Sequence, residues 1–240
     1  MKKISLVLIA MMFCFASFSQ TKKKPTQISE SLYILPKAGM NLQFEAAIAA
    51  HNEKFHPVGP HHAVLRRIEY GAKSGWYSWI MKGTYASLDS RPVTEGGHQE
   101  DWDKNVGPTV EEYGDVGLWA YDEDLSFGAD IFKKSKKYLI WSIDVKRGKS
   151  DRFKVIVEKL REAYKSIGTR AMLVYTNEVH TSGSADIALI WTLENYADLD
   201  SDWKTKEAFE KINGEGSWEK MVAEWYDTTV DHEEEIRTML

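Results

Sequence analysis

The feature that most constrains the fold of this chain is an internal repeat. Residues 85–90 read Tyr-Ala-Ser-Leu-Asp-Ser, and residues 196–201 read Tyr-Ala-Asp-Leu-Asp-Ser. Each copy directly follows an apolar segment that contains tryptophan, 76–83 in the first case and 186–193 in the second. The two copies lie nearly half a chain length apart. Because the hexapeptide and its flanking segment recur together, the sequence indicates a duplicated folding unit.

Both halves of the chain predict the same order of elements, strand-helix-strand-strand-helix-strand. Apolar residues at alternate positions mark the strands, and apolar residues three and four apart mark the helices. In the first half we expect strands at 31–36, 63–70, 76–83 and 116–121, and helices at 44–55 and 102–113. In the second half we expect strands at 138–145, from 171, at 186–193 and at 236–240, with helices from Phe153 and from Trp218. Gly107-Pro108 should kink or shorten the helix at 102–113.

The predicted strands carry apolar residues on both faces. In segment 76–83, Trp79 and Met81 lie on one face, and Trp76 and Ile80 lie on the other. A β-α-β-β-α-β unit covers one face of its antiparallel sheet with its two helices, so the other face needs a second sheet. Two units in one chain can supply that cover for each other. We therefore predict an α+β fold of two tandem ferredoxin-like repeats whose sheets pack together.

The sequence resembles the dimeric α/β-barrel superfamily of ferredoxin-like units in its element order, in the duplication of that order and in strands that are apolar on both faces. The resemblance is to a tandem version, in which one chain supplies both halves of the barrel, and it covers about residues 31–240. The superfamily includes cofactor-independent monooxygenases, haem-degrading enzymes, chlorite dismutases, dye-decolourising peroxidases, lactone isomerases and proteins with no known reaction. The resemblance implies a barrel, present as a monomeric pseudo-dimer or as a homo-oligomer, and does not choose among these activities.

The N-terminal residues predict export. Two lysines at positions 2 and 3 precede the apolar run 4–15, and small residues at 17 and 19 fit cleavage before Gln20. The run is short and lacks a stop-transfer flank, so we expect no permanent membrane span. The exported protein would lie in the periplasm or outside the cell. The expected organisation is a signal peptide at 1–19, a leader at 20–30, the first repeat at 31–121, a linker at 122–137 and the second repeat at 138–240.

The composition excludes several classes of function. Cys14 is the only cysteine and lies in the predicted signal peptide, so we expect neither a disulfide nor thiolate chemistry in the exported chain. The formal net charge is −5, and no long basic run follows the lysines at 22–24, so we expect no nucleic-acid partner. The sequence also lacks the glycine-rich motifs that bind phosphate, which argues against nucleotide-dependent chemistry.

The histidines are concentrated in the first half, which holds five of the 7. His51 falls on the apolar stripe of the first helix, where the second repeat has Leu160. It is either a core histidine bonded to a neighbour or part of a helix–sheet pocket, as a ligand, an acid or base, or a hydrogen-bond donor. His98 and Arg91 flank a polar loop without a counterpart in the second repeat, and this loop could form the lip of such a cleft. Asp101 is expected to cap the second helix.

The candidate ligand-binding residues combine these groups with aromatic side chains of the neighbouring strand, which are otherwise core: His51, His62, Tyr77, Trp79, Arg91 and His98. Segment 56–62 holds three histidines but lacks the helical i, i+4 spacing of paired metal ligands, so we expect no metal site, although such histidines can converge after folding. We expect no cofactor, with haem as the open alternative. The preferred function is binding of a small apolar or aromatic molecule in a helix–sheet cleft of the first repeat. The alternative is a histidine-based enzyme, either a cofactor-independent monooxygenase or isomerase, or a haem-using one.

Overall fold

The computed structural model describes residues 24–91, 95–181 and 183–240. The predicted signal peptide and Cys14 lie outside the described residues. The strands are β1 (Gln27–Pro36), β2 (Ala63–Tyr70), β3 (Tyr77–Thr84), β4 (Val110–Tyr121), β5 (Lys137–Val145), β6 (Met172–Asn177), β7 (Ile187–Leu193) and β8 (Thr229–Met239). The helices are α2 (Asn41–Phe55), α3 (Tyr85–Leu88), α4 (His98–Asp101), α5 (Ala129–Lys134), α6 (Ser150–Ile167), α7 (Thr205–Asn213) and α8 (Ser217–Thr228). None of these helices is long and apolar enough to cross a membrane.

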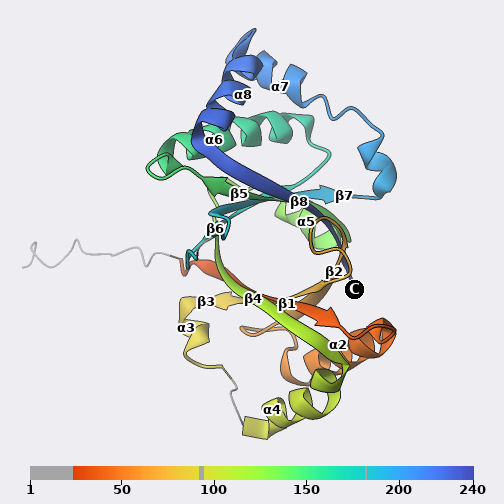
Figure 1. The fold of residues 1–240 in the computed structure, drawn as a ribbon. Coiled ribbons are helices and arrows are strands. Elements are labelled where there is room, and N and C mark those ends of the chain that lie inside the picture. Colours follow the sequence, from red (N-terminus) through yellow and green to blue (C-terminus); the bar gives the residue numbers. More distant parts are fainter. Residues whose placement is uncertain (1–23, 92–94, 182) are drawn as a thin grey trace, which may run out of the picture.

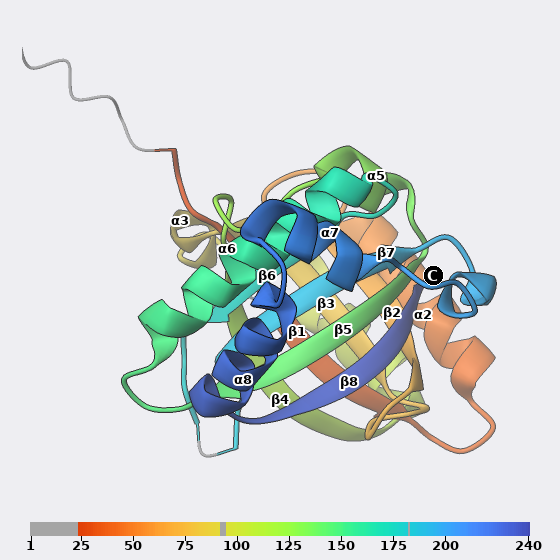
Figure 2. The same ribbon diagram turned by 90° about the horizontal axis from the view of Figure 1, so that it is seen from above.

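The strands form one closed antiparallel barrel in the order β1-β3-β2-β8-β5-β7-β6-β4. Each repeat contributes four neighbouring strands in the same relative order, β4-β1-β3-β2 from the first and β8-β5-β7-β6 from the second. Pairing of β2 with β8 and of β4 with β6 joins the two halves. The helices of the first repeat cover one outer side of the barrel, and those of the second cover the opposite side (Figures 1 and 2). This arrangement confirms the predicted fold class.

Alternation along the strands separates an outer core from a barrel interior. On β3, Tyr77, Trp79 and Met81 face outward and join a buried cluster with Phe44 and Ile48 of α2. The second repeat builds the equivalent cluster around the helices α6 and α8. The alternate residues face the barrel interior, where the opposite half-sheet covers them. The two-faced strands of the sequence are explained by this double cover.

The repeated hexapeptide forms the helical turn that follows the third strand of each repeat. Its first copy is α3, and its second is the 3-10 turn Tyr196–Leu199. The aspartates that end the turns have nearly the same backbone angles, φ −75° and ψ −17° at Asp89, and φ −76° and ψ −17° at Asp200. The segment therefore has a structural role, as its presence in both copies suggests.

The second helix of the first repeat is shorter and more broken than predicted. After α4, one π-helical turn covers Trp102–Val106 and one 3-10 turn covers Gly107–Thr109. Strand β4 then begins at Val110, whereas we predicted a helix to residue 113 and a strand from 116. Pro108 cannot donate a helical hydrogen bond, and the chain beyond it gains ladder pairing with β1 instead. Tertiary pairing thus overrides the helical spacing of the apolar residues.

Other boundaries also differ from the prediction. Strand β1 begins at Gln27, inside the expected leader, because its extra residues pair with both β3 and β4. Strand β8 begins at Thr229 rather than at residue 236, because it pairs with β5 along nearly its whole length. The expected linker contains α5, in which Phe132 packs on Tyr138 with ring centroids 4.8 Å apart. These segments are polar in sequence, and their structure depends on partners that are distant along the chain.

Two like charges face each other at one end of the barrel, where Asp144 of β5 lies opposite Asp231 of β8. Burial, a hydrogen bond to Asp186 and both neighbouring carboxylates raise the pKa of Asp144. A raised pKa in the folded state means that the ionised form destabilises the fold at neutral pH, and that protonation at lower pH removes this penalty. We expect Asp144→Asn to raise the free energy of unfolding at neutral pH by about 0.5–1 kcal/mol.

The gain should shrink as the pH falls through the raised pKa, because the wild-type carboxyl is then also protonated when folded. Urea unfolding at neutral pH and at about pH 4 checks both statements. Asp124→Asn is the matched control, because Asp124 is exposed and its charge should affect stability little. An Asp144→Asn gain of the same size at both pH values would contradict the explanation.

Candidate functional site

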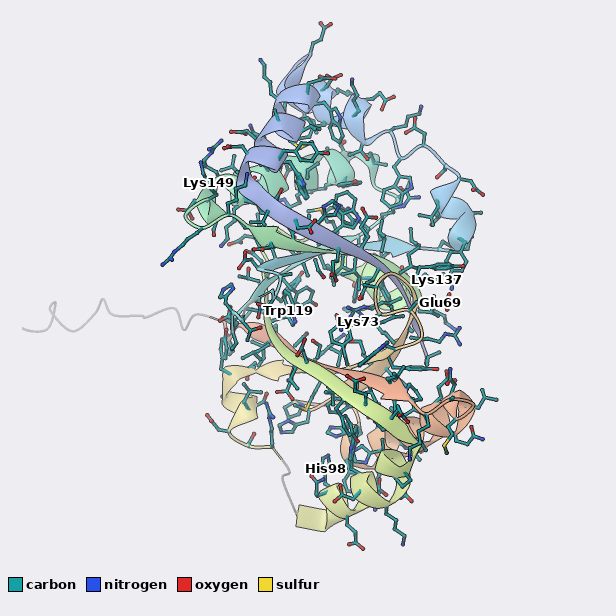
Figure 3. All side chains as sticks on the ribbon, viewed as in Figure 1. Glu69, Lys73, His98, Trp119, Lys137 and Lys149 are labelled. Carbon is teal, nitrogen blue, oxygen red and sulfur yellow. The ribbon has the colours of Figure 1, made fainter. Side chains whose placement is uncertain are left out.

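Three histidine side chains of the first repeat meet between α2 and α4. They are His51, His56 and His98, and one ring nitrogen from each lies within 4.8 Å of the others. His51 is on the last turns of α2, His56 directly follows that helix, and His98 begins α4. His51 and His56 are buried, and His98 is half-buried. The cluster lies on the outer side of the half-sheet, away from the barrel interior, as the label of His98 shows (Figure 3).

Hydrogen bonds orient two of the three rings. Nδ1 of His51 lies 2.8 Å from Oδ2 of Asp101, and Nδ1 of His56 lies 3.0 Å from the carbonyl oxygen of His61. Both partners only accept, so each Nδ1 carries the proton and donates it. In the neutral rings Nε2 is then an acceptor, and Nε2 of His51 is buried without a partner. Nε2 of His56 lies 2.9 Å from Nε2 of His98, which must therefore donate while the other accepts.

The surroundings disfavour the protonated forms of His56 and His98. Burial lowers the pKa of His56 to about 4, and the neighbouring His51 and His98 act in the same direction. Burial and then electrostatic repulsion from the neighbouring His51 lower the pKa of His98. The hydrogen bond from His51 lowers the pKa of the Asp101 carboxyl, so this partner stays an anion. Neutral imidazoles with oriented lone pairs are the form that binds metal ions or accepts protons.

An open cleft of about 340 Å³ adjoins the cluster. His56 and His98 reach it, whereas His51 lies behind them, fully buried. The remaining walls are mostly apolar or aromatic, with Arg91 paired to Glu30 at one side: Glu30, Leu32, Trp79, Met81, Arg91, Gln99 and Trp102. A space of this size and lining suits a small, mostly apolar molecule with one or two polar groups.

Two tryptophans form a rigid wall of the cleft. The rings of Trp79 and Trp102 meet edge to face with centroids 5.8 Å apart. Nε1 of Trp79 donates to Oδ1 of Asn52 at 2.9 Å, and Nε1 of Trp102 donates to the hydroxyl of Tyr113 at 2.9 Å. Because both indole N–H groups already have hydrogen-bond partners, the two rings present apolar surface to the cleft.

The candidate residues inferred from sequence divide into two groups. The structure brings His51, Trp79, Arg91 and His98 to the cleft or directly behind it. Tyr77 is fully buried in the core between α2 and the sheet, where its hydroxyl donates to Glu45 at 2.5 Å. His62 lies outside the cluster and half-exposed on the turn before β2.

Sequence reasoning passed over His56 and Asp101. His56 belongs to segment 56–62, in which we expected no metal ligand, but it is 3% exposed and its ring packs on Trp79 with centroids 5.0 Å apart. Asp101 appeared to be a helix cap, but it binds His51 across 50 positions of sequence. The only sequence signal for either was the concentration of histidines in one repeat. The second repeat has Leu160 in place of His51, and its described residues form no such cluster.

The expectation that the chain has no metal site is not supported by this arrangement. Zn²⁺–nitrogen bonds of about 2.0–2.1 Å place two ligands of a tetrahedral ion roughly 3.3 Å apart. The 2.9 Å between the Nε2 atoms of His56 and His98 is close to that separation. Ligating histidines commonly donate their other N–H to a carboxylate or a carbonyl, as His51 and His56 do here.

The donor set fits a single ion better than haem. A haem iron has its four equatorial positions filled by the porphyrin, so two histidines can bind only on opposite faces, about 4 Å apart with the ring between them. The Nε2 atoms of His56 and His98 are closer than that and in direct contact. A cleft of about 340 Å³, with Trp79 and Trp102 in its wall, also leaves little space for a macrocycle beside this cluster.

Known structures share the fold at low sequence identity. No family model and no curated protein matches the sequence. A candidate monooxygenase from Fusobacterium nucleatum aligns with 12% identity and a TM-score of 0.58 over 90% of this chain and 93% of its own. A mutant chlorite dismutase from Candidatus Nitrospira defluvii aligns with 7% identity and a TM-score of 0.54 over 90% of this chain and 92% of its own. An anthrone oxidase-like protein aligns with 9% identity and a TM-score of 0.52 over 91% of this chain and 92% of its own. Such identities establish the fold and not the reaction.

Proposed function

The chain has the fold of the dimeric α/β-barrel superfamily, and on this premise we propose that its first repeat is a metal-dependent site for a small, mostly apolar molecule. His51, His56 and His98 would hold one divalent transition-metal ion. The observation that carries the proposal is the convergence of three imidazoles, two of them already oriented by an acceptor on the opposite nitrogen. Imidazole donors suit Zn²⁺, Fe²⁺, Cu²⁺ and Ni²⁺ more than Mg²⁺ or Ca²⁺.

The burial of the cluster supports a function rather than a purely structural role. Leu160 at the position equivalent to His51 indicates that the fold accepts an apolar residue there. Nε2 of His51 and Nδ1 of His98 are buried without a hydrogen-bond partner, which costs stability in the metal-free protein. An ion would bind Nε2 of His51 and of His56 directly, and His98 would join through Nε2 once its proton has moved to Nδ1.

The cleft residues would position the second molecule. Trp79 and Trp102 offer flat apolar surface, Met81 and Leu32 close the wall, and Arg91 offers a cation near the opening. When bound, the ion would supply a Lewis acid next to a polar atom of that molecule. Exclusion of water by the aromatic wall would strengthen this electrostatic effect.

Metal-free acid–base catalysis is the second candidate, and it corresponds to a cofactor-independent monooxygenase or isomerase. Its support is the His56–His98 contact, in which a proton can pass between two rings that line the cleft. The Asp101–His51 pair cannot act on a ligand directly, because His51 does not reach the cleft. Activity that survives removal of all metal by a chelator would favour this candidate over the metal site.

Titration with Co²⁺ tests the metal proposal, because this ion reports its coordination through visible absorption bands. We expect one Co²⁺ per chain, with bands typical of imidazole ligation, and displacement by Zn²⁺. His98→Gln should weaken Co²⁺ binding by about 100-fold, because loss of one of three ligands removes roughly 3 kcal/mol of a binding energy near 10 kcal/mol. His62→Gln is the matched control, since it removes a half-exposed imidazole from a nearby turn outside the cluster, and the Co²⁺ affinity of this variant should equal that of the wild type.

The same spectral titration separates the outcomes. Equal weakening by His98→Gln and His62→Gln would mean that Co²⁺ binds superficially and would contradict the site. No Co²⁺ bands in the wild type would also contradict it. A strong Soret band after addition of haem, lost in His98→Gln but not in His62→Gln, would replace the single ion by haem.

A further inference from the structure

The barrel interior contains a second candidate site, unrelated to the histidine cluster. Strand β2 points Arg66 inward, where the residue is 3% exposed. A cavity of about 60 Å³ lies next to it. We propose that this cavity binds a small monovalent oxyanion, a short-chain carboxylate, through the guanidinium of Arg66.

The charge balance of the interior is the first observation. Arg66, Lys82 and Arg237 line the cavity, and no carboxylate does. Of these, Arg237 is neutralised by Glu235, with Nη2 to Oε2 at 2.6 Å. Among the described residues, neither Arg66 nor Lys82 has an acidic partner within salt-bridge distance. The interior therefore carries positive charge that the protein itself does not compensate.

Arg66 cannot relieve this situation by losing its proton. A buried lysine can become neutral, and burial and the charge of Arg66 do lower the pKa of Lys82. A guanidinium stays charged in proteins, so a buried one requires a counter-charge or hydrogen-bond acceptors. Nε of Arg66 is buried without a partner, as is Oγ of Ser78, the residue paired with Arg66 across β2 and β3.

Aromatic contacts compensate only part of the charge. The guanidinium carbon lies 4.3 Å from the ring centroid of Tyr138 and 5.4 Å from that of Phe132. These rings hold the cation in place, but a cation–π contact gives no acceptor to the N–H groups. A carboxylate can accept two parallel N–H bonds from a guanidinium. None of the lining residues accepts such bonds from Arg66.

The rest of the lining defines the ligand. Hydroxyls and an indole N–H can donate to an anion, and Trp119 is one of these lining groups (Figure 3): Ser29, Ser31, Tyr33, Ser142, Tyr175 and Trp119. The other walls are aliphatic, from Ile80, Ile140, Ala188 and Ile190. A volume of about 60 Å³ is that of roughly two water molecules. The cavity therefore suits a carboxylate with a short alkyl end, such as acetate.

The route into the cavity also affects selection. One end of the barrel is closed by α5, whose Phe132 packs on Tyr138. At the other end, an opening of about 450 Å³ shares Ser31, Tyr33, Trp119 and Ser142 with the cavity. Acidic residues line its rim: Asp115, Asp144, Asp231 and Glu233. These charges repel anions, most strongly multivalent ones, so added salt should speed the entry of acetate by screening them.

Calorimetric titration of the purified protein with sodium acetate tests the proposal. Nitrate and sulfate serve as further probes, for a small inorganic oxyanion and for one of higher charge. We expect one acetate per chain, weaker binding of nitrate and none of sulfate. Arg66→Met should weaken acetate binding by about tenfold or more, because a bidentate charged contact is lost. Its melting temperature without acetate should be no lower than that of the wild type, because an unpaired buried charge is removed.

Arg67→Met is the matched control for Arg66→Met. Arg67 is the next residue of β2, points to the outside, and pairs with Glu69 at 2.9 Å. Its replacement should leave acetate affinity unchanged. No saturable acetate binding by the wild type, or equal affinity in the wild type and Arg66→Met, would overturn the proposal. If Arg66→Met does not fold, Arg66→Lys decides, because it keeps the charge without the two parallel N–H donors, and unchanged acetate affinity in that variant would overturn the proposal as well.

Discussion

His51→Leu is expected to abolish tight Co²⁺ binding and to leave the metal-free protein as stable as the wild type. Loss of one of three imidazole ligands should weaken the site by on the order of 100-fold. Stability should change by less than about 1 kcal/mol, because a buried nitrogen without a partner is removed together with one hydrogen bond. The released Asp101 side chain is 18% exposed and can bind water instead.

The equivalent position of the second repeat supports this expectation. Leu160 of α6 occupies it and is 6% exposed, so the same framework packs leucine there without strain. Stability must be compared by urea unfolding in the presence of a chelator, because bound metal would stabilise the wild type alone. Co²⁺ absorption then measures affinity on the same samples. A loss of more than about 2 kcal/mol in the metal-free variant would show that His51 is chiefly a structural residue.

Phe153→Ala and Phe44→Ala are expected to cost about 3–5 kcal/mol each in the free energy of unfolding. These two residues occupy equivalent positions in the two repeats, and both are fully buried. Phe153 packs on Trp225 with ring centroids 5.1 Å apart, and Phe44 packs on Tyr77 at 5.0 Å. Because helix and sheet meet at these rings, truncation leaves a cavity that the surrounding strands cannot fill.

Substitutions on the outer faces of the same helices provide controls. Val155 of α6 is 46% exposed and Leu42 of α2 is 78% exposed, so replacement of either by alanine should cost less than about 0.5 kcal/mol. Urea unfolding followed by tryptophan fluorescence and by circular dichroism should give one transition for every variant, because β2–β8 and β4–β6 pairing joins the repeats. Separate transitions for Phe44→Ala and Phe153→Ala would mean that the repeats unfold independently.

The sequence alone was enough to predict the repeat, the α+β class and the mutual cover of the two half-sheets, whereas the barrel was implied by the family resemblance. Those properties depend on local spacing: the hexapeptide marks the same turn twice, and the apolar pattern of 76–83 requires cover on both faces. Comparison of the repeats also pointed to His51, because its counterpart is Leu160. Such differences are visible without coordinates, since equivalent positions in a duplicated chain should have similar environments.

The cluster around His51 was decided by tertiary structure. His56 became buried because its ring packs on Trp79 of β3, and Asp101 reached His51 because the turn Trp102–Val106 that follows it packs against α2. Neither contact has a local sequence signal. The uncompensated charge of Arg66 was equally invisible, because alternation along β2 marks a residue as inward or outward only once the barrel has closed. Pairing between segments that are distant in sequence therefore determines both sites. The physical reason is that the burial of a side chain, its hydrogen-bond partners and the local charge balance depend on the assembled barrel and not on any one segment.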